Sequence, residues 1–315
     1  MTPRGCFFAA AGILIGLTGA RAAESGAPAR PRVLGVAQVA YYVRDIQLSR
    51  KFYGGFLGYE EAFTLAKPGG GLRAALFKID DRQTVELVPE VAPGTDRLHH
   101  IALETDDVEG MRLYLRSRGI VVPDAVTKGQ VTAAYFSVKD PDGHGIEFVQ
   151  YFPRSGMAGD AGRHLPAARV SRHLSHAGIM VRHLDAGLAF YRDILGGVVI
   201  RKGSGDGKRL SWVNVRVADG ADWVEFMLYD QPPPLAKIGV NHHFCLDVTD
   251  AAQAAEILKA RPLPPGASLS AKVSTGTDHK RKIQAFDPDC TRIEFMEPQT
   301  FDGLPSPWSD APPPS

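Results

Sequence analysis

Four short apolar segments each begin with a side chain that can bind a metal, and a glutamate follows each of them about fifty residues later. The separations run from 47 to 51 residues. Imidazole nitrogens combined with carboxylate oxygens suit zinc, iron(II), nickel, cobalt or manganese. The repetition therefore predicts binding of a divalent metal ion. The pairs are Gln38 with Glu86, His100 with Glu147, His176 with Glu225, and His243 with Glu294.

Two of these segments begin with adjacent histidines, His99 with His100 and His242 with His243. Successive side chains of a strand point to opposite faces. We expect His100 and His243 on the face that carries the site, opposite the apolar residues. We expect His99 and His242 on the apolar face, as hydrogen-bonded or half-exposed imidazoles. Small residues two positions after the candidate ligands leave room for a metal and a substrate: Ala40, Ala102, Gly178 and Cys245.

Each of the four glutamates lies between apolar neighbours, as Glu294 does between Ile293 and Phe295. A buried carboxylate is costly unless it is paired or coordinates a cation. Four such glutamates at equivalent positions favour a ligand role in at least one half of the chain. The sequence leaves open which half is active.

The candidate ligands belong to a repeated unit of one strand, one helix and further strands. The pattern F-Y-x-x-x-L-G occurs twice and predicts helices that end at Gly58 and Gly196. A D-P-D-x turn precedes the last strand of the second and fourth units, and Cys290 replaces the glycine of the second turn. The order predicts halves at residues 33–151 and 172–298, a linker at 152–171 and a loose Pro-rich tail at 299–315.

The composition is that of a globular protein, with 44% hydrophobic residues, 23% charged residues and a net charge of +1. This balance gives no electrostatic footprint for nucleic acid or an anionic membrane surface. We expect a small-molecule substrate and a monomer or homodimer. The mature chain keeps Cys245 and Cys290, and the sequence leaves their oxidation state open.

Residues 1–23 have the features of a secretory signal peptide. Arg4 precedes an apolar run from Phe7 to Leu17, and small residues follow at Ala20 and Ala22. The run is short for a membrane span. We therefore expect export, either to a periplasm or out of the cell, with no membrane attachment after cleavage.

The signal peptide predicts a mature N-terminus near Ala23, because cleavage follows small residues at alternate positions. Mass spectrometry of the protein exported by its native host would measure that terminus. An intact Met1 on the soluble protein would contradict the prediction.

Taken together, the helix motif, the D-P-D-G turn and the ligands at the strands resemble the vicinal oxygen chelate superfamily. This superfamily includes glyoxalase I, extradiol dioxygenases, methylmalonyl-CoA epimerase and bleomycin-resistance proteins. The resemblance covers residues 33–298. It implies an α+β fold of four βαβββ modules that form two paired-module, mostly antiparallel, cup-shaped half-barrels.

The resemblance also implies roles for the candidate ligands. The first four, Gln38, Glu86, His100 and Glu147, resemble the Gln/Glu/His/Glu set of glyoxalase I, and the second four resemble its His/Glu/His/Glu version. In glyoxalase I a glutamate ligand moves the substrate proton while the metal holds an enediolate. Glu147 and Glu294 match that glutamate. This implies an exported lyase or isomerase acting on a small oxygen-rich substrate.

Two alternatives remain open. His176, His243 and Glu294 also resemble the iron(II) triad of extradiol dioxygenases, but Gln284 stands where those enzymes carry a tyrosine, and His279 is shifted from their acid/base histidine. The other alternative is a non-catalytic binding protein of the bleomycin-resistance type. The basic cluster at residues 279–282 is a solvated loop or a clamp for a carboxylate or phosphate of the substrate.

Overall fold

A computed structural model of the protein describes Met1 and residues 28–94, 96–153, 156–231, 233–234 and 240–314. The apolar run of the expected signal peptide lies outside the described residues. Within the described part of the chain, no helix is long and apolar enough to cross a membrane.

Two βαβββ modules form the first half of the chain. The first module is β1 (Val33–Val43), α1 (Ile46–Arg50), which continues as the π-helix η1 (Lys51–Phe56), β2 (Glu60–Ala66), β3 (Leu72–Lys78) and β4 (Thr84–Pro89). The second is β5 (Leu98–Thr105), α2 (Val108–Ser117), β6 (Thr127–Lys128), β7 (Ala134–Lys139) and β8 (Gly145–Gln150). The short helix α3 (Gly156–Gly159) follows in the linker.

The second half repeats this order. Its first module is β9 (Leu174–Val181), α4 (Leu184–Leu188) with η2 (Ala189–Ile194), β10 (Val198–Gly203), β11 (Trp212–Arg216) and β12 (Trp223–Leu228). Its second is β13 (His243–Asp247), α6 (Ala251–Lys259), β14 (Ser268–Thr275), β15 (Lys280–Phe286) and β16 (Arg292–Thr300). The predicted helix-ending glycines, Gly58 and Gly196, both have positive φ, as helix termination favours.

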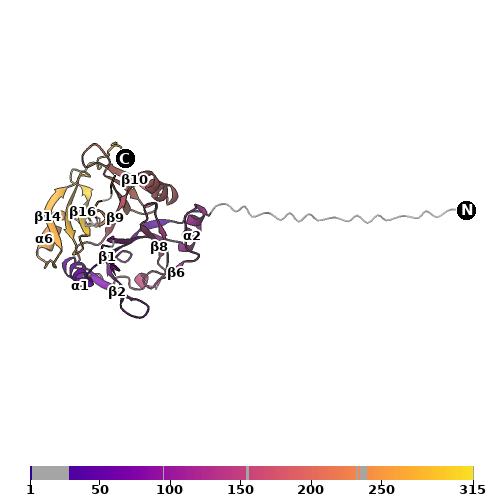
Figure 1. Ribbon diagram of the computed structural model, residues 1–315, viewed down its shortest axis with the longest axis horizontal. Coiled ribbons are helices and arrows are strands. Elements are labelled where there is room, and N and C mark those ends of the chain that lie inside the picture. The colour runs from indigo at the N-terminus through magenta and orange to yellow at the C-terminus, as the bar shows by residue number, and fades with distance from the viewer. Residues whose placement is uncertain (2–27, 95, 154–155, 232, 235–239, 315) are drawn as a thin grey trace.

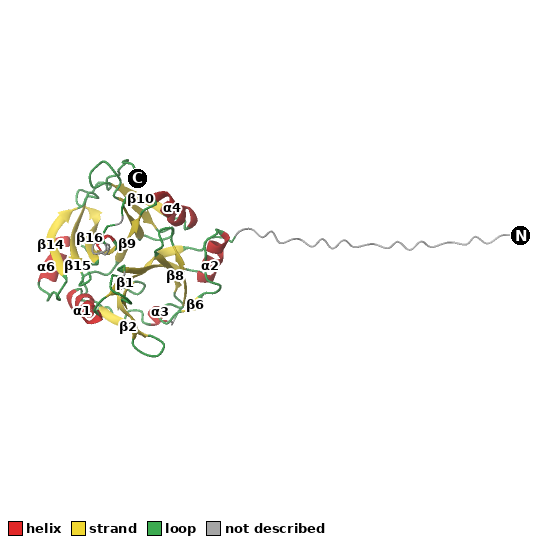
Figure 2. Cartoon of the chain, viewed as in Figure 1, coloured by secondary structure: helices red, strands yellow, loops and turns green. Residues whose placement is uncertain are grey.

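Each half forms one eight-stranded sheet, and the two sheets have the same order. The first is β2-β3-β4-β1-β5-β8-β7-β6, and the second is β10-β11-β12-β9-β13-β16-β15-β14. In each sheet five strand pairs are antiparallel and two are parallel. The helices lie around the periphery and the strands fill the interior (Figure 2). The predicted α+β fold with two paired-module halves is confirmed.

The two motifs found twice in the sequence contact each other across the halves. The tyrosine of the first helix motif, Tyr53, donates a hydrogen bond to Asp287 of the second D-P-D turn at 3.1 Å. Reciprocally, Tyr191 donates to Asp140 of the first such turn at 3.0 Å. The modules therefore pack first against fourth and second against third, and Figure 1 accordingly shows α1 near α6.

His173 contacts two carboxylates of the second half, Asp222 just before β12 and Asp247 at the end of β13. Its Nε2 lies 2.9 Å from Asp222 Oδ1, and its Nδ1 lies 2.9 Å from Asp247 Oδ2. Asp222 also accepts a hydrogen bond from the backbone N–H of Val36 in the first half at 2.8 Å. Hydrogen bonds to both carboxylates raise the pKa of His173 to about 10. The imidazolium therefore stabilises the interface between the halves at neutral pH.

We expect the free energy of unfolding to fall as the pH rises from about 6.5 to about 10. Unfolded His173 has a pKa near 6.5, so its contribution is complete below that value and is lost as the pH passes through the folded value of about 10. Chemical denaturation at pH 6 and at pH 9 measures the effect. In the His173→Gln variant, the difference in stability between these two pH values should shrink. An unchanged difference would assign the pH dependence to other groups.

Cys290 adopts the backbone conformation of the glycine that it replaces. Its φ is 67°, and Gly143 at the equivalent position has a φ of 90°. The turn is therefore preserved, although a residue with a side chain is strained there by roughly 1–2 kcal/mol. Both Cys290, which is exposed, and Cys245, which is buried, are free thiols.

We expect Cys290→Gly to raise the free energy of unfolding by about 0.5–1 kcal/mol, because relief of backbone strain exceeds the extra entropy of glycine in the unfolded chain. Gly143→Ala is the reciprocal variant. A Cβ at Gly143 meets nothing within 4 Å, so its expected loss of about 1 kcal/mol reports strain alone. Urea denaturation of both variants measures these changes, and effects of the same sign would contradict the explanation.

Described residues of the Pro-rich tail, which we expected to be loose, hydrogen-bond to the second half. Ser309 N–H donates to Lys202 O at 2.9 Å, and Pro312 O accepts from Leu210 N–H at 2.8 Å. The ring of Trp308 lies under the ammonium of Lys202. Proline removes donors but keeps its carbonyl acceptor, so a Pro-rich segment can bind along a strand edge.

Candidate metal centre

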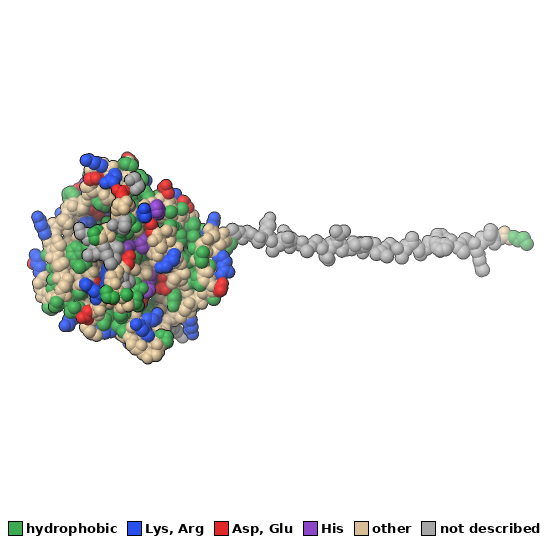
Figure 3. Space-filling model, in the orientation of Figure 1, with side chains coloured by type: hydrophobic (Ala, Val, Ile, Leu, Met, Phe, Trp, Pro, Cys, Tyr) green, Lys and Arg blue, Asp and Glu red, His purple; other side chains and the backbone are tan. Residues whose placement is uncertain are grey.

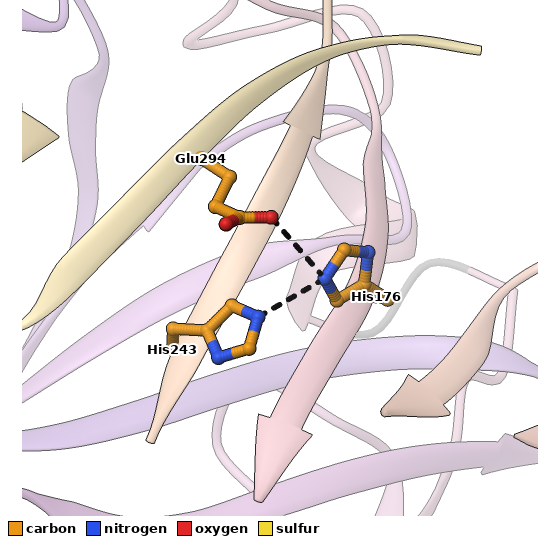
Figure 4. Close-up of side chains that lie close together, drawn as sticks. All are labelled: His176, His243 and Glu294. Carbon is orange, nitrogen blue, oxygen red and sulfur yellow. Dashed lines mark hydrogen bonds and ion pairs between the residues drawn. The ribbon is translucent and has the colours of Figure 1, made fainter. Parts of the chain in front are cut away.

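The four candidate ligands of the second half lie on the four central strands of its sheet. His176 is on β9, Glu225 on β12, His243 on β13 and Glu294 on β16. Gly178 is the register partner of both His243 and Glu225. The side chains of His176, His243 and Glu294 point toward one another (Figure 4), and their ligand atoms lie within 4.8 Å of one another. We call this site the C-terminal cup.

The distances suit one shared ion. The Nε2 atoms of His176 and His243 are 3.2 Å apart, and two nitrogens bound at ~2.1 Å to one ion lie about 3.0–3.4 Å apart. Oε2 of Glu225 lies 3.1 Å from His243 Nε2 and 3.9 Å from His176 Nε2. Oε2 of Glu294 lies 4.0 Å from His176 Nε2. The donor set of two imidazoles and two carboxylates fits a divalent transition metal.

Neighbouring polar groups orient two of these side chains. Lys282 Nζ and Gln284 Nε2 donate to Oε1 of Glu294 at 3.2 and 3.1 Å, which leaves Oε2 toward His176. Nδ1 of His243 lies 2.8 Å from the carbonyl of Asn241 and 2.9 Å from Nη2 of Arg292. Nδ1 would donate to Asn241 in one tautomer and accept from Arg292 in the other. Only the tautomer that donates to Asn241 leaves Nε2 unprotonated and able to bind a metal.

The electrostatics of the C-terminal cup favour the protonation states that a metal needs. Burial lowers the pKa of His176 to about 4, so its imidazole is neutral. Burial alone would raise the pKa of Glu294, but the charges of Lys282 and Arg292 hold it well below its usual range. Burial alone would raise the pKa of Glu225, but its hydrogen bond with His243 and the charges of His176 and His243 together lower it to about 2. His176, Glu225 and Glu294 are therefore in the protonation states in which they bind a metal.

The four candidate ligands of the first half lie on the equivalent strands but form a different arrangement. Nε2 of His100 is 3.4 Å from Glu147 Oε2 and has no hydrogen-bond partner, whereas Gln38 donates to Glu86. Burial raises the pKa of Glu147 to about 7, with a further contribution from the charge of Glu86. This N-terminal cup is therefore partly protonated at neutral pH, and a metal must displace that proton.

The neighbouring histidines depart from strict strand alternation in one half. His99 Nδ1 lies 2.6 Å from His100 Nδ1, and both side chains line the N-terminal cavity. The β1–β5 register is irregular at this point and gives His99 no partner, so the expectation that it faces away from the site is wrong. His242, in contrast, is 2% exposed and contacts Asp96 at 3.3 Å.

Both cups open into cavities. The N-terminal cavity has a volume of about 610 Å³, and the C-terminal cavity has a volume of about 390 Å³. The smaller cavity has indole walls from Trp212 and Trp223, and the ring of Trp223 stacks on His176 with centroids 4.8 Å apart. Figure 3 shows histidine side chains near the middle of one face, with positive and negative side chains interspersed around them.

Sequence reasoning missed several residues that line the C-terminal cavity, among them Arg201, Asn214 and Arg292. The basic cluster at 279–282 divides between two environments. Lys280 and Lys282 line the cavity, whereas His279 contacts Asp302 at 2.7 Å in a turn. Strand alternation from Gln284 back through Lys282 could have identified the two lysines. His279 is not among the described residues of the cavity wall.

The chain matches one known protein family over both halves. The family model described as the Glyoxalase/Bleomycin resistance protein/Dioxygenase superfamily matches residues 35–148 and 173–299. Among curated proteins, the uncharacterized protein YwbC of Bacillus subtilis (strain 168) is 29% identical over 116 residues, which is 34% of this chain and 90% of YwbC.

Solved structures with the same fold include two enzyme classes. The Mn(II)-bound glyoxalase from Novosphingobium aromaticivorans has 20% identity and a TM-score of 0.64, covering 85% of this chain and 83% of that chain. The 2,3-dioxygenase LapB from Pseudomonas sp. KL28 has 16% identity and a TM-score of 0.66, covering 89% of this chain and 99% of that chain. At these identities the similarity shows the fold.

Proposed function

Since the chain belongs to the Glyoxalase/Bleomycin resistance protein/Dioxygenase superfamily, we propose that its C-terminal cup is the active site of a divalent-metal enzyme. The enzyme would catalyse proton transfer, isomerisation or lyase chemistry on a small oxygen-rich substrate. The observation that carries this proposal is the convergence of His176, His243 and Glu294 within 4.8 Å, with Glu225 beside them.

The residues of the cup have separate roles in this proposal. His176, His243, Glu225 and Glu294 hold the ion, which when bound supplies Lewis-acid polarisation of substrate oxygens. Glu294 is the proton acceptor in this proposal; Lys282 and Arg292 keep its carboxylate ionised and therefore able to accept a proton, although they also lower its basicity. Trp212 and Trp223 form walls that exclude water from the reacting atoms. Our proposal places the protein outside the cytoplasm, where the signal segment would direct it.

The number of ligands favours proton transfer over oxygen chemistry. With Glu225 included, four protein donors would hold the ion, one more than in the two-histidine, one-carboxylate sites of non-haem iron(II) oxygenases. Fewer positions on the ion would then be open to small molecules. Gln284 also hydrogen-bonds to Glu294, where those enzymes carry a tyrosine.

Ring cleavage remains the second candidate function because one observation favours it. Without Glu225, the group His176, His243 and Glu294 is a two-histidine, one-carboxylate triad, the typical ligand set of non-haem iron(II) oxygenases. A weak or absent bond from Glu225 to the ion would therefore shift the proposal to this reaction.

Metal analysis and two assays test the proposal. The protein is purified without chelator and its metal content is measured by mass spectrometry, then compared with that of a His176→Ala variant. Zinc-, manganese- and nickel-loaded protein is assayed in D₂O for deuterium exchange into α-hydroxycarbonyl compounds. Iron(II)-loaded protein is assayed with catechols for oxygen uptake.

We expect about one metal per chain that depends on His176, and deuterium exchange without oxygen uptake. Oxygen uptake with a catechol would establish the second candidate function instead. A wild-type protein that retains no metal after loading would contradict both.

A further inference from the structure

Arg201 of β10 is a buried cation without an ion-pair partner among the described residues. It is 7% exposed and lines the C-terminal cavity. Its Nη2 donates to Thr277 Oγ1 at 2.9 Å, and its guanidinium lies 5.5 Å from the ring centre of Trp212. Its Nε has no hydrogen-bond partner. A buried charge is costly unless it is paired. The charges of Asp278 and Glu225 act on Arg201 from a distance, but no carboxylate of the described residues forms an ion pair with it, so its guanidinium remains available to an anion.

The fold itself does not require an arginine here. Arg201 stands five residues after the helix-ending Gly196, and Phe63 stands five residues after Gly58 in the first half. An irregularity in the strand register occurs at both positions, between Val199 and Arg201 and between Glu61 and Phe63. Such bulges re-aim side chains, often beside active sites. In the first half the apolar ring of Phe63 occupies the equivalent position, so the fold does not need a charge there. The guanidinium of Arg201 is therefore specific to the C-terminal cavity.

The charged side chains of the cavity wall leave an excess of one positive charge, since four cations, Arg201, Lys280, Lys282 and Arg292, face three carboxylates, Glu225, Asp278 and Glu294. Lys282 and Arg292 are both within 4 Å of Glu294. Lys280 has no ion pair among the described residues, and its ammonium lies 5.4 Å from the ring centre of Trp223. Arg201 and Lys280 are thus two cations beside two indole faces. A bound divalent ion would add further positive charge and strengthen the attraction for an anion.

We propose that Arg201, with Lys280, binds the carboxylate of a small planar unsaturated acid, and that this acid is the substrate class of the C-terminal cup. The planar guanidinium matches a carboxylate in two-point hydrogen bonding. The flat body of the acid would lie along the indole of Trp223, which stacks on His176, and would so reach the metal ligands. The role of this acid as a substrate rests on the proposed function, whereas its binding does not.

Calorimetric titration with three probes tests this inference on metal-free protein and again on zinc-loaded protein. The probes are benzoate, its neutral isostere benzamide and phenyl phosphate. The variants are Arg201→Met, which removes the charge, and Arg201→Lys, which keeps the charge without the planar fork. Arg281→Met is the matched control, because Arg281 is exposed on β15 between the two cavity lysines and does not line the cavity. Circular dichroism checks the folding of each variant.

We expect wild-type protein to bind benzoate at least tenfold more tightly than benzamide or phenyl phosphate. Arg201→Met should weaken benzoate binding tenfold or more, Arg201→Lys should weaken it less, and Arg281→Met should leave it within twofold. No detectable benzoate binding to wild-type protein, equal binding of benzamide, or tighter binding of phenyl phosphate would each overturn the inference. Arg201-dependent binding to metal-free protein that cannot be loaded with metal would uphold the carboxylate site and refute the proposed function.

Discussion

Replacing His243 with alanine is expected to remove most of the bound metal and to lower metal affinity more than ~100-fold, since loss of an outer-shell contact alone costs 10–100-fold. His243 Nε2 lies 3.2 Å from His176 Nε2 and 3.1 Å from Glu225 Oε2. It therefore occupies the middle of the donor set. Metal content per folded chain and competition with a metal-binding dye measure the loss.

His242 provides the control because it is equally buried but contributes nothing to the donor set. Its Nε2 faces Asp96 at 3.3 Å, and its ring contacts that of His144. His242→Ala should lower the free energy of unfolding by about 1–3 kcal/mol, since Asp96 loses a partner, yet leave metal affinity within a few-fold. Metal loss of similar size in both variants would refute the assignment of His243.

The fold could be predicted because its signals are local and repeated. The helix motif that contains Tyr53 and Tyr191, and the D-P-D turns, mark equivalent points of the modules without knowledge of the tertiary structure. How the halves pack could not be predicted. The hydrogen bonds of Tyr53 with Asp287 and of Tyr191 with Asp140 join residues from opposite halves, and nothing in their spacing distinguishes this pairing from one within a half or between two chains.

The candidate ligands were accessible to sequence reasoning because strand alternation is a strict local rule, whereas their environment was not. Lys282 and Arg292 lower the pKa of Glu294. Glu147 at the equivalent position has no lysine or arginine within ion-pair distance among the described residues, and burial raises its pKa to about 7. Two cups with similar ligand sets thus differ in charge. His99 and Arg201 lie at irregularities of strand register, where alternation by itself places a side chain wrongly.

Gly178→Ala is expected to lower metal affinity about 10–100-fold without removing any ligand, an effect on the scale of lost ligand orientation. A Cβ at Gly178 would overlap the imidazole of His243, which is fully buried in a closely packed part of the sheet. The ring must rotate or shift away from His176 and Glu225, and the donor atoms would no longer meet. In the first half Ala40 occupies the equivalent position opposite His100, so the difference is specific to the C-terminal cup.

Gly55→Ala is the matched control for this substitution, because it adds the same methyl group at a position where a Cβ meets nothing within 4 Å. Both variants are titrated with zinc in the presence of a competing dye, and thermal unfolding is recorded without metal. We expect normal zinc affinity in Gly55→Ala and a weakened site in Gly178→Ala, whose metal-free fold persists because the β9 backbone keeps its register. If Gly178→Ala binds zinc as tightly as the wild-type protein, His243 cannot be a ligand in the orientation described, and the metal centre must be built from other side chains.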